Sequence, residues 1–218
     1  MNIESLFSVA GKTAVVTGGS RGIGEMIARA LIENGVSVII TSRKISDCEG
    51  LAAQLGPACT AIPADLSQMA EIERFAAAVA AVTPRVDILF NNAGASWGAG
   101  FDEFPEAGWD KVMDINVKSV FFLTQKLAPL LEAAASPGNL AKVINIGSID
   151  GQHVSDLETY SYAASKAGVL HMTRMMAKFL AKRHISVNAI APGFFPSKMT
   201  AGIAEEFREA FRAATPMQ

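Results

Sequence analysis

The stretch TAVVTGGSRGIG, residues 13–24, carries the strongest structural signal in the chain. Its first five residues form an apolar, β-branched run, which is typical of a strand covered on both faces. Glycines follow at once, and a helical pattern then continues over 22–34. Glycine lets the backbone turn sharply and lets another group approach it closely. The stretch therefore predicts a buried strand, a tight turn and a helix.

The same alternation of strand and helix recurs along the rest of the chain. Further apolar runs predict strands over 36–40, 60–64, 86–90, 142–146 and 185–190. Helical patterns lie between and after them, over 45–55, 67–82, 106–135, 157–183 and 198–213. Repeated strand–helix units imply right-handed crossovers and a doubly wound parallel sheet, the Rossmann fold, with strand order 3-2-1-4-5-6. We expect residues 1–218 to form a single α/β domain, with its ligand crevice at the carboxyl ends of the strands.

Composition excludes several classes of function. The 218 residues are 50% hydrophobic, enough to fill one sizeable core. A net charge of -2 provides no field that would hold nucleic acid or an anionic membrane. Cys48 and Cys59 form no CxxC motif, and His153, His171 and His184 show no metal-ligand spacing. We expect reduced, structural cysteines and no metal site.

The N-terminal residues contain an acid at Glu4 and lack the basic start and apolar run of a secretory signal. No uninterrupted apolar run approaches the roughly 18 residues that a membrane span needs. The sequence therefore predicts a soluble, cytoplasmic protein.

The glycine-rich turn at 17–24 predicts a dinucleotide site, because the following helix offers free N–H groups and a positive dipole end to a pyrophosphate. NAD sites usually carry an acid roughly 20 residues further on, at the end of the second strand. Here residues 41–44 read TSRK, and Arg21 lies in the glycine turn. Guanidinium groups bind a phosphate in a fork, so Arg21 and Arg43 favour NADPH over NADH. The alternative for Arg43 and Lys44 is a solvated helix start.

Further short motifs follow the predicted strands or lie in the predicted helices. They are NNAG at 91–94, MDINV at 113–117, NIGS at 145–148, YAASK at 162–166 and APG at 191–193. Together with the glycine turn, and in this order, they make the chain resemble the short-chain dehydrogenase/reductase family from about residue 10 to beyond residue 200. NNAGASWGA, INIGS and APGFFPSKMT more narrowly resemble bacterial 3-oxoacyl-[acyl-carrier-protein] reductases of the fatty-acid and rhamnolipid type.

The resemblance implies a catalytic set of Asn116, Ser148, Tyr162 and Lys166. Tyr162 would protonate the substrate carbonyl oxygen, Ser148 would steady the charge on that oxygen, and Asn116 would hold a water that links Lys166 to solvent. Lys166 would favour the tyrosine anion and hold the nicotinamide ribose, since residues four apart share a helix face. Tyr160 would point elsewhere. The alternatives are a helix-capping Ser148 and an Asn116 satisfied in the core.

The same matching assigns cofactor contacts beyond Tyr162 and Lys166. They are Gly18, Ser20, Arg21, Ile23, Ser42, Arg43, Asp65, Leu66, Asn92, Ala93, Gly94, Pro192, Gly193, Phe195 and Ser197. A second set of side chains would wall a substrate pocket or else belong to the core. These are Trp97, Ile149, His153, Phe194 and Met199.

By this resemblance the chain is expected to be an NADP-dependent oxidoreductase that reduces a carbonyl to a secondary alcohol, most simply in a 3-oxoacyl thioester. The alternatives are a polyol, sugar or steroid dehydrogenase of the same family, and a non-catalytic NADPH-binding protein. An intact catalytic set speaks against the last.

Relatives of this type continue beyond a T-P-M segment into another helix and a seventh strand, whereas this sequence ends at 215–218. The resemblance therefore implies a six-stranded sheet with no seventh strand. Family members are often homotetramers. Here we expect a homodimer at most, formed through the helices over 106–135 and 157–183.

Overall fold

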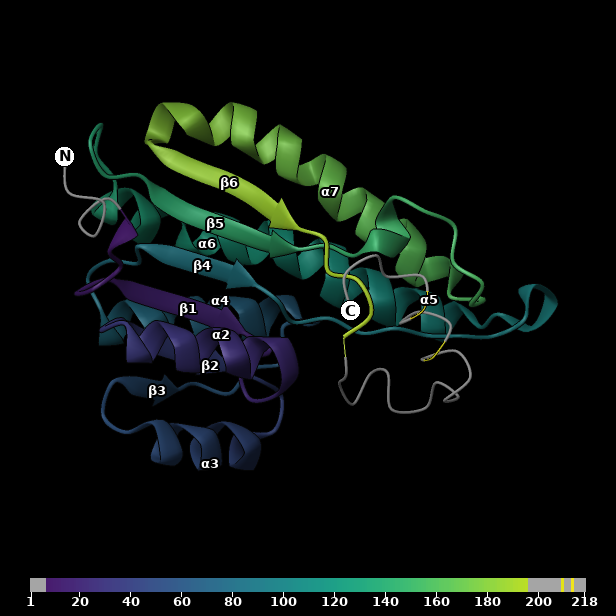
Figure 1. The fold of residues 1–218 in the computed structure, drawn as a ribbon, viewed down its shortest axis with the longest axis horizontal. Coiled ribbons are helices and arrows are strands. Elements are labelled where there is room, and N and C mark those ends of the chain that lie inside the picture. The colour runs from purple at the N-terminus through teal and green to yellow at the C-terminus, as the bar shows by residue number, and fades with distance from the viewer. Residues whose placement is uncertain (1–6, 196–208, 210–212, 214–218) are drawn as a thin grey trace.

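The computed structural model describes residues 7–195 together with Glu209 and Ala213. These residues contain a sheet of six parallel strands in the order β3-β2-β1-β4-β5-β6, so the predicted strand order is confirmed (Figure 1). The strands are β1 (Thr13–Thr17), β2 (Ser37–Thr41), β3 (Cys59–Ala61), β4 (Ile88–Asn91), β5 (Ala141–Ile146) and β6 (Ile185–Ile190). β3 is shorter than predicted and ends before Pro63, which has no amide hydrogen to donate to a ladder.

Helices cover both faces of this sheet (Figure 1). One face packs against α2 (Gly22–Glu33) and α3 (Ile45–Leu55). The other packs against α4 (Met69–Val82), α6 (Ser119–Ala134) and α7 (Tyr160–Leu180). The sequence causes this arrangement because successive strand residues point to opposite faces. In β1, Ala14 and Val16 join the core under α2 and α3, whereas Val15 joins the core under α4 and α6.

The segment 106–135 differs from the single helix that its pattern predicts. It forms α5 (Glu106–Met113), a π-helical turn over Asp114–Lys118, and then α6. The predicted helix over 106–135 thus contains an irregular turn that the pattern does not indicate. Asn116 lies in this turn, is 1% exposed and accepts a hydrogen bond from the amide of Ala95. A π turn adds a residue to one helical turn, and such turns are frequent at functional sites.

The remaining predicted helix, over 198–213, lies outside the described residues. The described helix α7 begins at Tyr160 and ends at Leu180, and a short 3-10 turn over Ala181–Arg183 follows it. Across the described part of the chain, no helix is both long and apolar enough to cross a membrane. No group of His, Cys, Asp and Glu side chains among these residues could hold a metal ion.

Candidate active site

The carboxyl ends of the strands open into a cleft of about 1280 Å³. It extends from the glycine turn after β1 to the first turns of α7. The predicted cofactor residues that the structure describes all line it: Gly18, Ser20, Arg21, Ile23, Ser42, Arg43, Asp65, Leu66, Asn92, Ala93, Gly94, Tyr162, Lys166, Pro192, Gly193 and Phe195. Ser197 lies outside the described residues.

The glycine turn is closed by tight contacts that a side chain would break. Gly18 has a φ of +63°, in the left-handed region that favours glycine. A Cβ on Gly24 would lie 2.2 Å from the carbonyl oxygen of Gly18. From the end of β4, Asn92 donates its side-chain amide to the carbonyl of Thr17, at 2.8 Å. The free amides at the start of α2 are thereby held at the floor of the cleft, where they suit a pyrophosphate.

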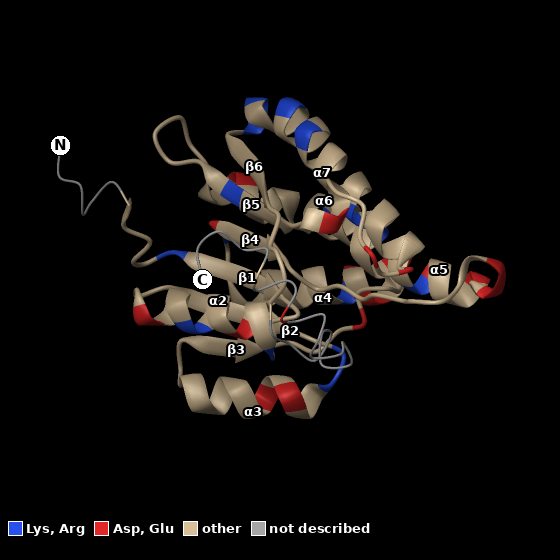
Figure 2. Ribbon diagram, turned by 45° about the vertical axis from the view of Figure 1, so that its right-hand side comes forward, with Lys and Arg blue, Asp and Glu red and all other residues tan. Residues whose placement is uncertain are grey.

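Basic side chains lie at the end of the cleft where β2 leads into α3, and the loop that enters α3 is blue in Figure 2. Arg21 and Arg43 are exposed, and neither forms an ion pair with any described residue. No carboxylate occupies the end of β2, where residues 41–44 read TSRK. This end of the cleft therefore suits a phosphate on the ribose 2'-oxygen, which carries negative charge and accepts hydrogen bonds.

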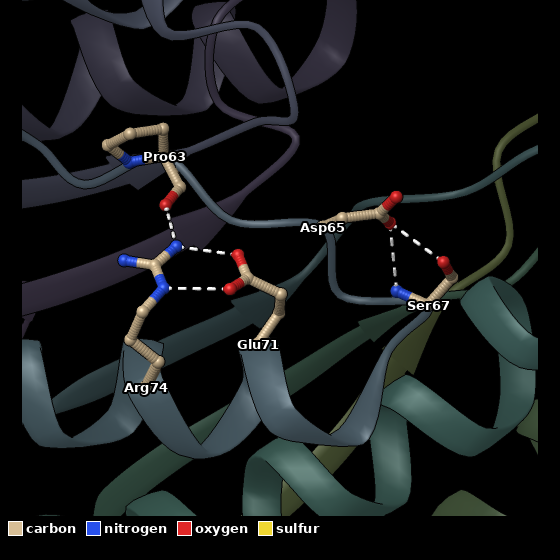
Figure 3. Close-up of polar contacts among 5 residues, drawn as sticks. All are labelled: Pro63, Asp65, Ser67, Glu71 and Arg74. Atoms are coloured by element: carbon tan, nitrogen blue, oxygen red, sulfur yellow. Dashed lines mark hydrogen bonds and ion pairs between the residues drawn. The ribbon is translucent and has the colours of Figure 1, made fainter.

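The loop after β3 contributes Asp65 and Ser67 to the wall of the cleft, and Figure 3 shows their contacts. Ser67 donates both its backbone amide and its hydroxyl to Oδ1 of Asp65, at 3.1 and 2.8 Å. Beside these two residues, Arg74 forms an ion pair with Glu71 and donates to the carbonyl oxygen of Pro63 (Figure 3). These contacts fix the position of Asp65 at the predicted adenine end of the cleft.

At the opposite end, Ser148 and Tyr162 meet across the cleft. Ser148 directly precedes a short 3-10 turn that begins at Ile149, and its side chain is buried. Its hydroxyl lies close enough to the phenol of Tyr162 to lower the pKa of that phenol. Burial raises the pKa of Tyr162, and this effect outweighs the lowering by Ser148. The phenol therefore stays protonated at neutral pH and is suited to donate a proton.

Lys166 lies one helical turn beyond Tyr162 and is nearly fully buried. Its ammonium group donates to the carbonyl oxygen of Ile146, the last residue of β5, at 2.7 Å, and lies 5.5 Å from the centre of the Tyr162 ring. Burial lowers the pKa of Lys166 to about 8. The hydrogen bond to the carbonyl oxygen of Ile146 thus holds the ammonium group of Lys166 near the ring of Tyr162.

Asn116 does not line the cleft but lies directly behind it. Its Nδ2 donates to the carbonyl of Ala95 and to the hydroxyl of Ser165, and its Oδ1 accepts the amide of Ala95. Both Nδ2 hydrogens are therefore engaged, and Oδ1 keeps one lone pair. A water between Asn116 and Lys166 stays a prediction, which this remaining lone pair permits.

Tyr160 belongs to a separate environment. Its hydroxyl donates to Glu158 at 2.7 Å, and its ring meets Phe101 and Phe104 edge-on, each at 5.8 Å between centres. The side chain is 38% exposed. The sequence places two tyrosines together, and the structure brings only Tyr162 to Ser148 and Lys166.

The predicted substrate wall is only partly assembled. Ile149 and Phe194 line the cleft. Trp97 instead packs against Gly108 with the ammonium group of Lys111 over its ring, and His153 is exposed and does not line the cleft. Met199 lies outside the described residues. Of the two alternatives for these side chains, neither Trp97 nor His153 walls the described cleft: Trp97 occupies the space that a side chain on Gly108 would fill, and His153 lies exposed.

Sequence reasoning missed several residues at the substrate end of the cleft, namely Lys111, Asp150, Ser155, Leu157 and Thr159. Asp150 is the most informative of them, because its charge raises the pKa of Tyr162. Its backbone amide donates to the hydroxyl of Ser148 at 3.2 Å. Asp150 follows β5 as directly as Ser148 does, so its position at a carboxyl end was the signal that could have found it.

Comparisons with known proteins agree with this geometry. A family model described as short chain dehydrogenase matches residues 12–207. The rhamnolipids biosynthesis 3-oxoacyl-[acyl-carrier-protein] reductase of Pseudomonas aeruginosa is 50% identical over 97% of this chain and 84% of its own length. The 2-dehydro-3-deoxy-D-gluconate 5-dehydrogenase of Escherichia coli is 38% identical over 95% of this chain and 81% of its own.

Among solved structures, the Pseudomonas aeruginosa RhlG/NADP active-site complex superposes with a TM-score of 0.92 at 50% identity. The match covers 97% of this chain and 84% of that chain. This chain therefore shares its fold with members of one family. Its cleft, its glycine turn and its cluster of Ser148, Tyr162 and Lys166 lie within that shared fold. The chain belongs to the short-chain dehydrogenase family of oxidoreductases.

Proposed function

We propose that the chain uses NADPH to reduce the carbonyl of a 3-oxoacyl thioester to a secondary alcohol. One observation carries the proposal: a single cleft joins guanidinium groups that have no ion-pair partner among the described residues to a tyrosine beside a buried serine and a buried lysine. When bound, NADPH supplies the hydride. The chain contributes binding, orientation and a proton.

In this reaction Ser148 and Tyr162 both hydrogen-bond to the carbonyl oxygen of the substrate. The phenol of Tyr162 transfers its proton to that oxygen as negative charge develops there. The tyrosine is left as an anion, and the neighbouring ammonium group of Lys166 stabilises it. Asn116 holds the loop at Ala95 against α7 and is thus a positioning residue for Lys166 and its surroundings.

The charge of Asp150 predicts a pH effect. Asp150→Asn removes a negative charge that raises the pKa of Tyr162, so the tyrosine will lose its proton at lower pH. Because reduction needs the protonated phenol, we expect the alkaline fall in its rate to move to lower pH. Rate profiles with saturating NADPH measure this.

Asp156→Asn is the matched control, because Asp156 is exposed on the same loop and is not among the groups that shift the pKa of Tyr162. A profile that moves to higher pH, or that moves equally in both variants, would contradict the role of Asp150.

The preference for NADPH rests on the basic end of the cleft. Arg43→Ala removes an exposed guanidinium group that has no ion-pair partner in the described chain. Hydrogen bonds to a charged group contribute about 1.5–3 kcal/mol, so we expect NADPH affinity to fall roughly tenfold to a hundredfold. NADH affinity should change little. Comparable kcat/KM for both cofactors in the unaltered protein would refute the preference.

The acyl substrate is supported by the apolar side chains of Ile149, Leu157 and Phe194 in the cleft wall, and by the 3-oxoacyl reductase at 50% identity. The relative that acts on a sugar acid, at 38% identity, makes a direct comparison necessary. NADPH oxidation should be faster with 3-oxoacyl thioesters of increasing chain length than with 2-dehydro-3-deoxy-D-gluconate. Equal or faster turnover of the sugar acid would favour the other reaction.

We also propose a homodimer formed through α6 and α7. Phe121 on α6 and Met175 and Phe179 on α7 are 42%, 47% and 62% exposed, and apolar side chains of this size are favourable interface cores. Light scattering should give twice the chain mass, and Phe179→Asp should lower it toward a single chain. An unaltered protein with the mass of one chain in solution, or a Phe179→Asp variant that keeps the mass of two chains, would contradict this interface.

The whole of residues 1–218 is proposed to act as one NADP-binding catalytic domain. A cytoplasmic location is proposed with it, since NADPH is an intracellular reductant and both cysteines, Cys48 and Cys59, are free thiols.

A further inference from the structure

We propose that Cys48 is a positioning residue for the loop that recognises the 2'-phosphate, and that it thereby contributes to the preference for NADPH. The inference rests on the proposed cofactor. Cys48 is fully buried in α3 and does not touch the cleft. It acts through Ser42, which lines the cleft beside Arg43.

The contacts of Ser42 define how the thiol acts. The hydroxyl of Ser42 donates to the carbonyl oxygen of Lys44 at 3.2 Å and lies 3.0 Å from the sulfur of Cys48. The backbone amide of Ser42 also lies close enough to lower the pKa of the thiol, against the larger raising effect of burial. Either atom of the Ser42–Cys48 pair can be the donor. A hydroxyl has one hydrogen, so when that hydrogen is directed at the carbonyl oxygen of Lys44, the thiol is the donor to Ser42. The Cys48 side chain thus forms a hydrogen bond with the side chain of a residue that lines the cleft.

The thiol is suited to remain a donor. Burial raises the pKa of Cys48, so the S–H group persists at neutral pH. When a phosphate enters, the hydroxyl of Ser42 can turn its hydrogen from Lys44 to a phosphate oxygen. The thiol continues to donate to the same hydroxyl oxygen and keeps it in place. Ser42 is then pre-positioned for a charged acceptor beside Arg43.

A second, independent feature marks this end of the cleft as a ligand site. Thr41, the last residue of β2, also lines the cleft, and its Oγ1 is buried with no hydrogen-bond partner among the described residues. A buried hydroxyl without a partner costs roughly 1–3 kcal/mol. Such a group is tolerable where a bound ligand supplies the missing partner. Thr41 and Ser42 thus both line the end of the cleft that is proposed to hold the ribose.

The chain offers a matched control, because Cys59 is its other cysteine. Cys59 lies in β3, is 8% exposed and packs in the same core cluster as Cys48. It has no hydrogen bond to Ser42. Removing its sulfur therefore disturbs the same core without disturbing the cleft loop.

The experiment measures the dissociation constants of NADPH and NADH by fluorescence titration of the unaltered protein and four variants. Cys48→Ala and Cys48→Val remove the hydrogen bond, and Val also preserves volume in case Ala weakens folding. We expect both to lose about fivefold in affinity for NADPH, with less than about twofold change for NADH. Cys48→Ser, which can donate again, should restore NADPH affinity, and Cys59→Ala should leave the ratio of the two affinities unchanged.

Two kinds of failure are distinguishable. If the unaltered protein prefers NADPH but Cys48→Ala and Cys48→Val keep that preference, or weaken both cofactors equally, the inference about Cys48 is wrong and the proposed function stands. A Cys48→Ser variant that behaves like Cys48→Ala overturns it as well. If the unaltered protein binds both cofactors equally, the proposed NADPH preference fails and the role of Cys48 fails with it.

Discussion

Replacing Tyr162 by phenylalanine is expected to lower the rate of carbonyl reduction by roughly a thousandfold, while NADPH binds nearly as before. The phenol lies close enough to Ser148 for that hydroxyl to lower its pKa, and the ammonium group of Lys166 is 5.5 Å from the centre of its ring. Phenylalanine keeps the ring and its packing but has no proton to transfer. Steady-state turnover and a fluorescence titration of NADPH, both on the same preparation, separate the loss of chemistry from a loss of binding.

Tyr160→Phe is the control, since it removes the same atom two residues earlier. Within the described part of the chain its hydroxyl bonds only to Glu158, and neither residue lines the cleft, so we expect the variant to retain most of its activity. Equal losses in the two variants would show that the assignment of Tyr162 is wrong.

Replacing Gly24 by alanine is expected to weaken cofactor binding by roughly a hundredfold. The added methyl group would lie 2.2 Å from the carbonyl oxygen of Gly18 and 2.5 Å from Nδ2 of Asn92, so the start of α2 must move away from the glycine turn. A displacement of about 1 Å at a binding group can cost two orders of magnitude. Titration with NADPH, alongside thermal unfolding, measures the effect.

Gly50→Ala is the matched control. Gly50 lies within α3, and a Cβ there meets nothing within 4 Å. Alanine is the better helix former by about 1 kcal/mol, so this variant should melt at a higher temperature and bind NADPH unchanged. A Gly24→Ala protein that binds NADPH like the unaltered protein would show that the turn has more room than its contacts indicate.

Periodicity and turn chemistry were sufficient to predict most of the fold. The apolar runs of β1 and β6 end at residues 17 and 190 as predicted, because each run is bounded by glycine, proline or charged residues. The parallel order followed from the alternation of strand and helix. The π turn at Asn116 could not be predicted in this way, because the local pattern does not indicate it and the hydrogen-bond partner of Asn116, Ala95, lies 21 residues away.

The residues of the candidate site likewise differ in how far the sequence predicts them. Most of the proposed cofactor and catalytic residues lie directly after strands or one turn apart on a helix, where spacing alone indicates a common location. Asp150 and Cys48 were missed as functional candidates for different reasons. Asp150 follows Ser148 in the same loop and could have been included, whereas Cys48 acts across a turn through Ser42, a contact that only the folded chain reveals.

The most direct test of the central proposal follows the hydride itself. NADPH carrying deuterium at the transferable position of its nicotinamide is mixed with a 3-oxoacyl thioester, and the 3-hydroxyacyl product is analysed by mass spectrometry. We predict that the unaltered protein places the deuterium on the carbinol carbon and that Tyr162→Phe yields almost no labelled product. Product without deuterium at that carbon, or undiminished labelling by Tyr162→Phe, would contradict reduction of the carbonyl by NADPH with Tyr162 as the proton donor.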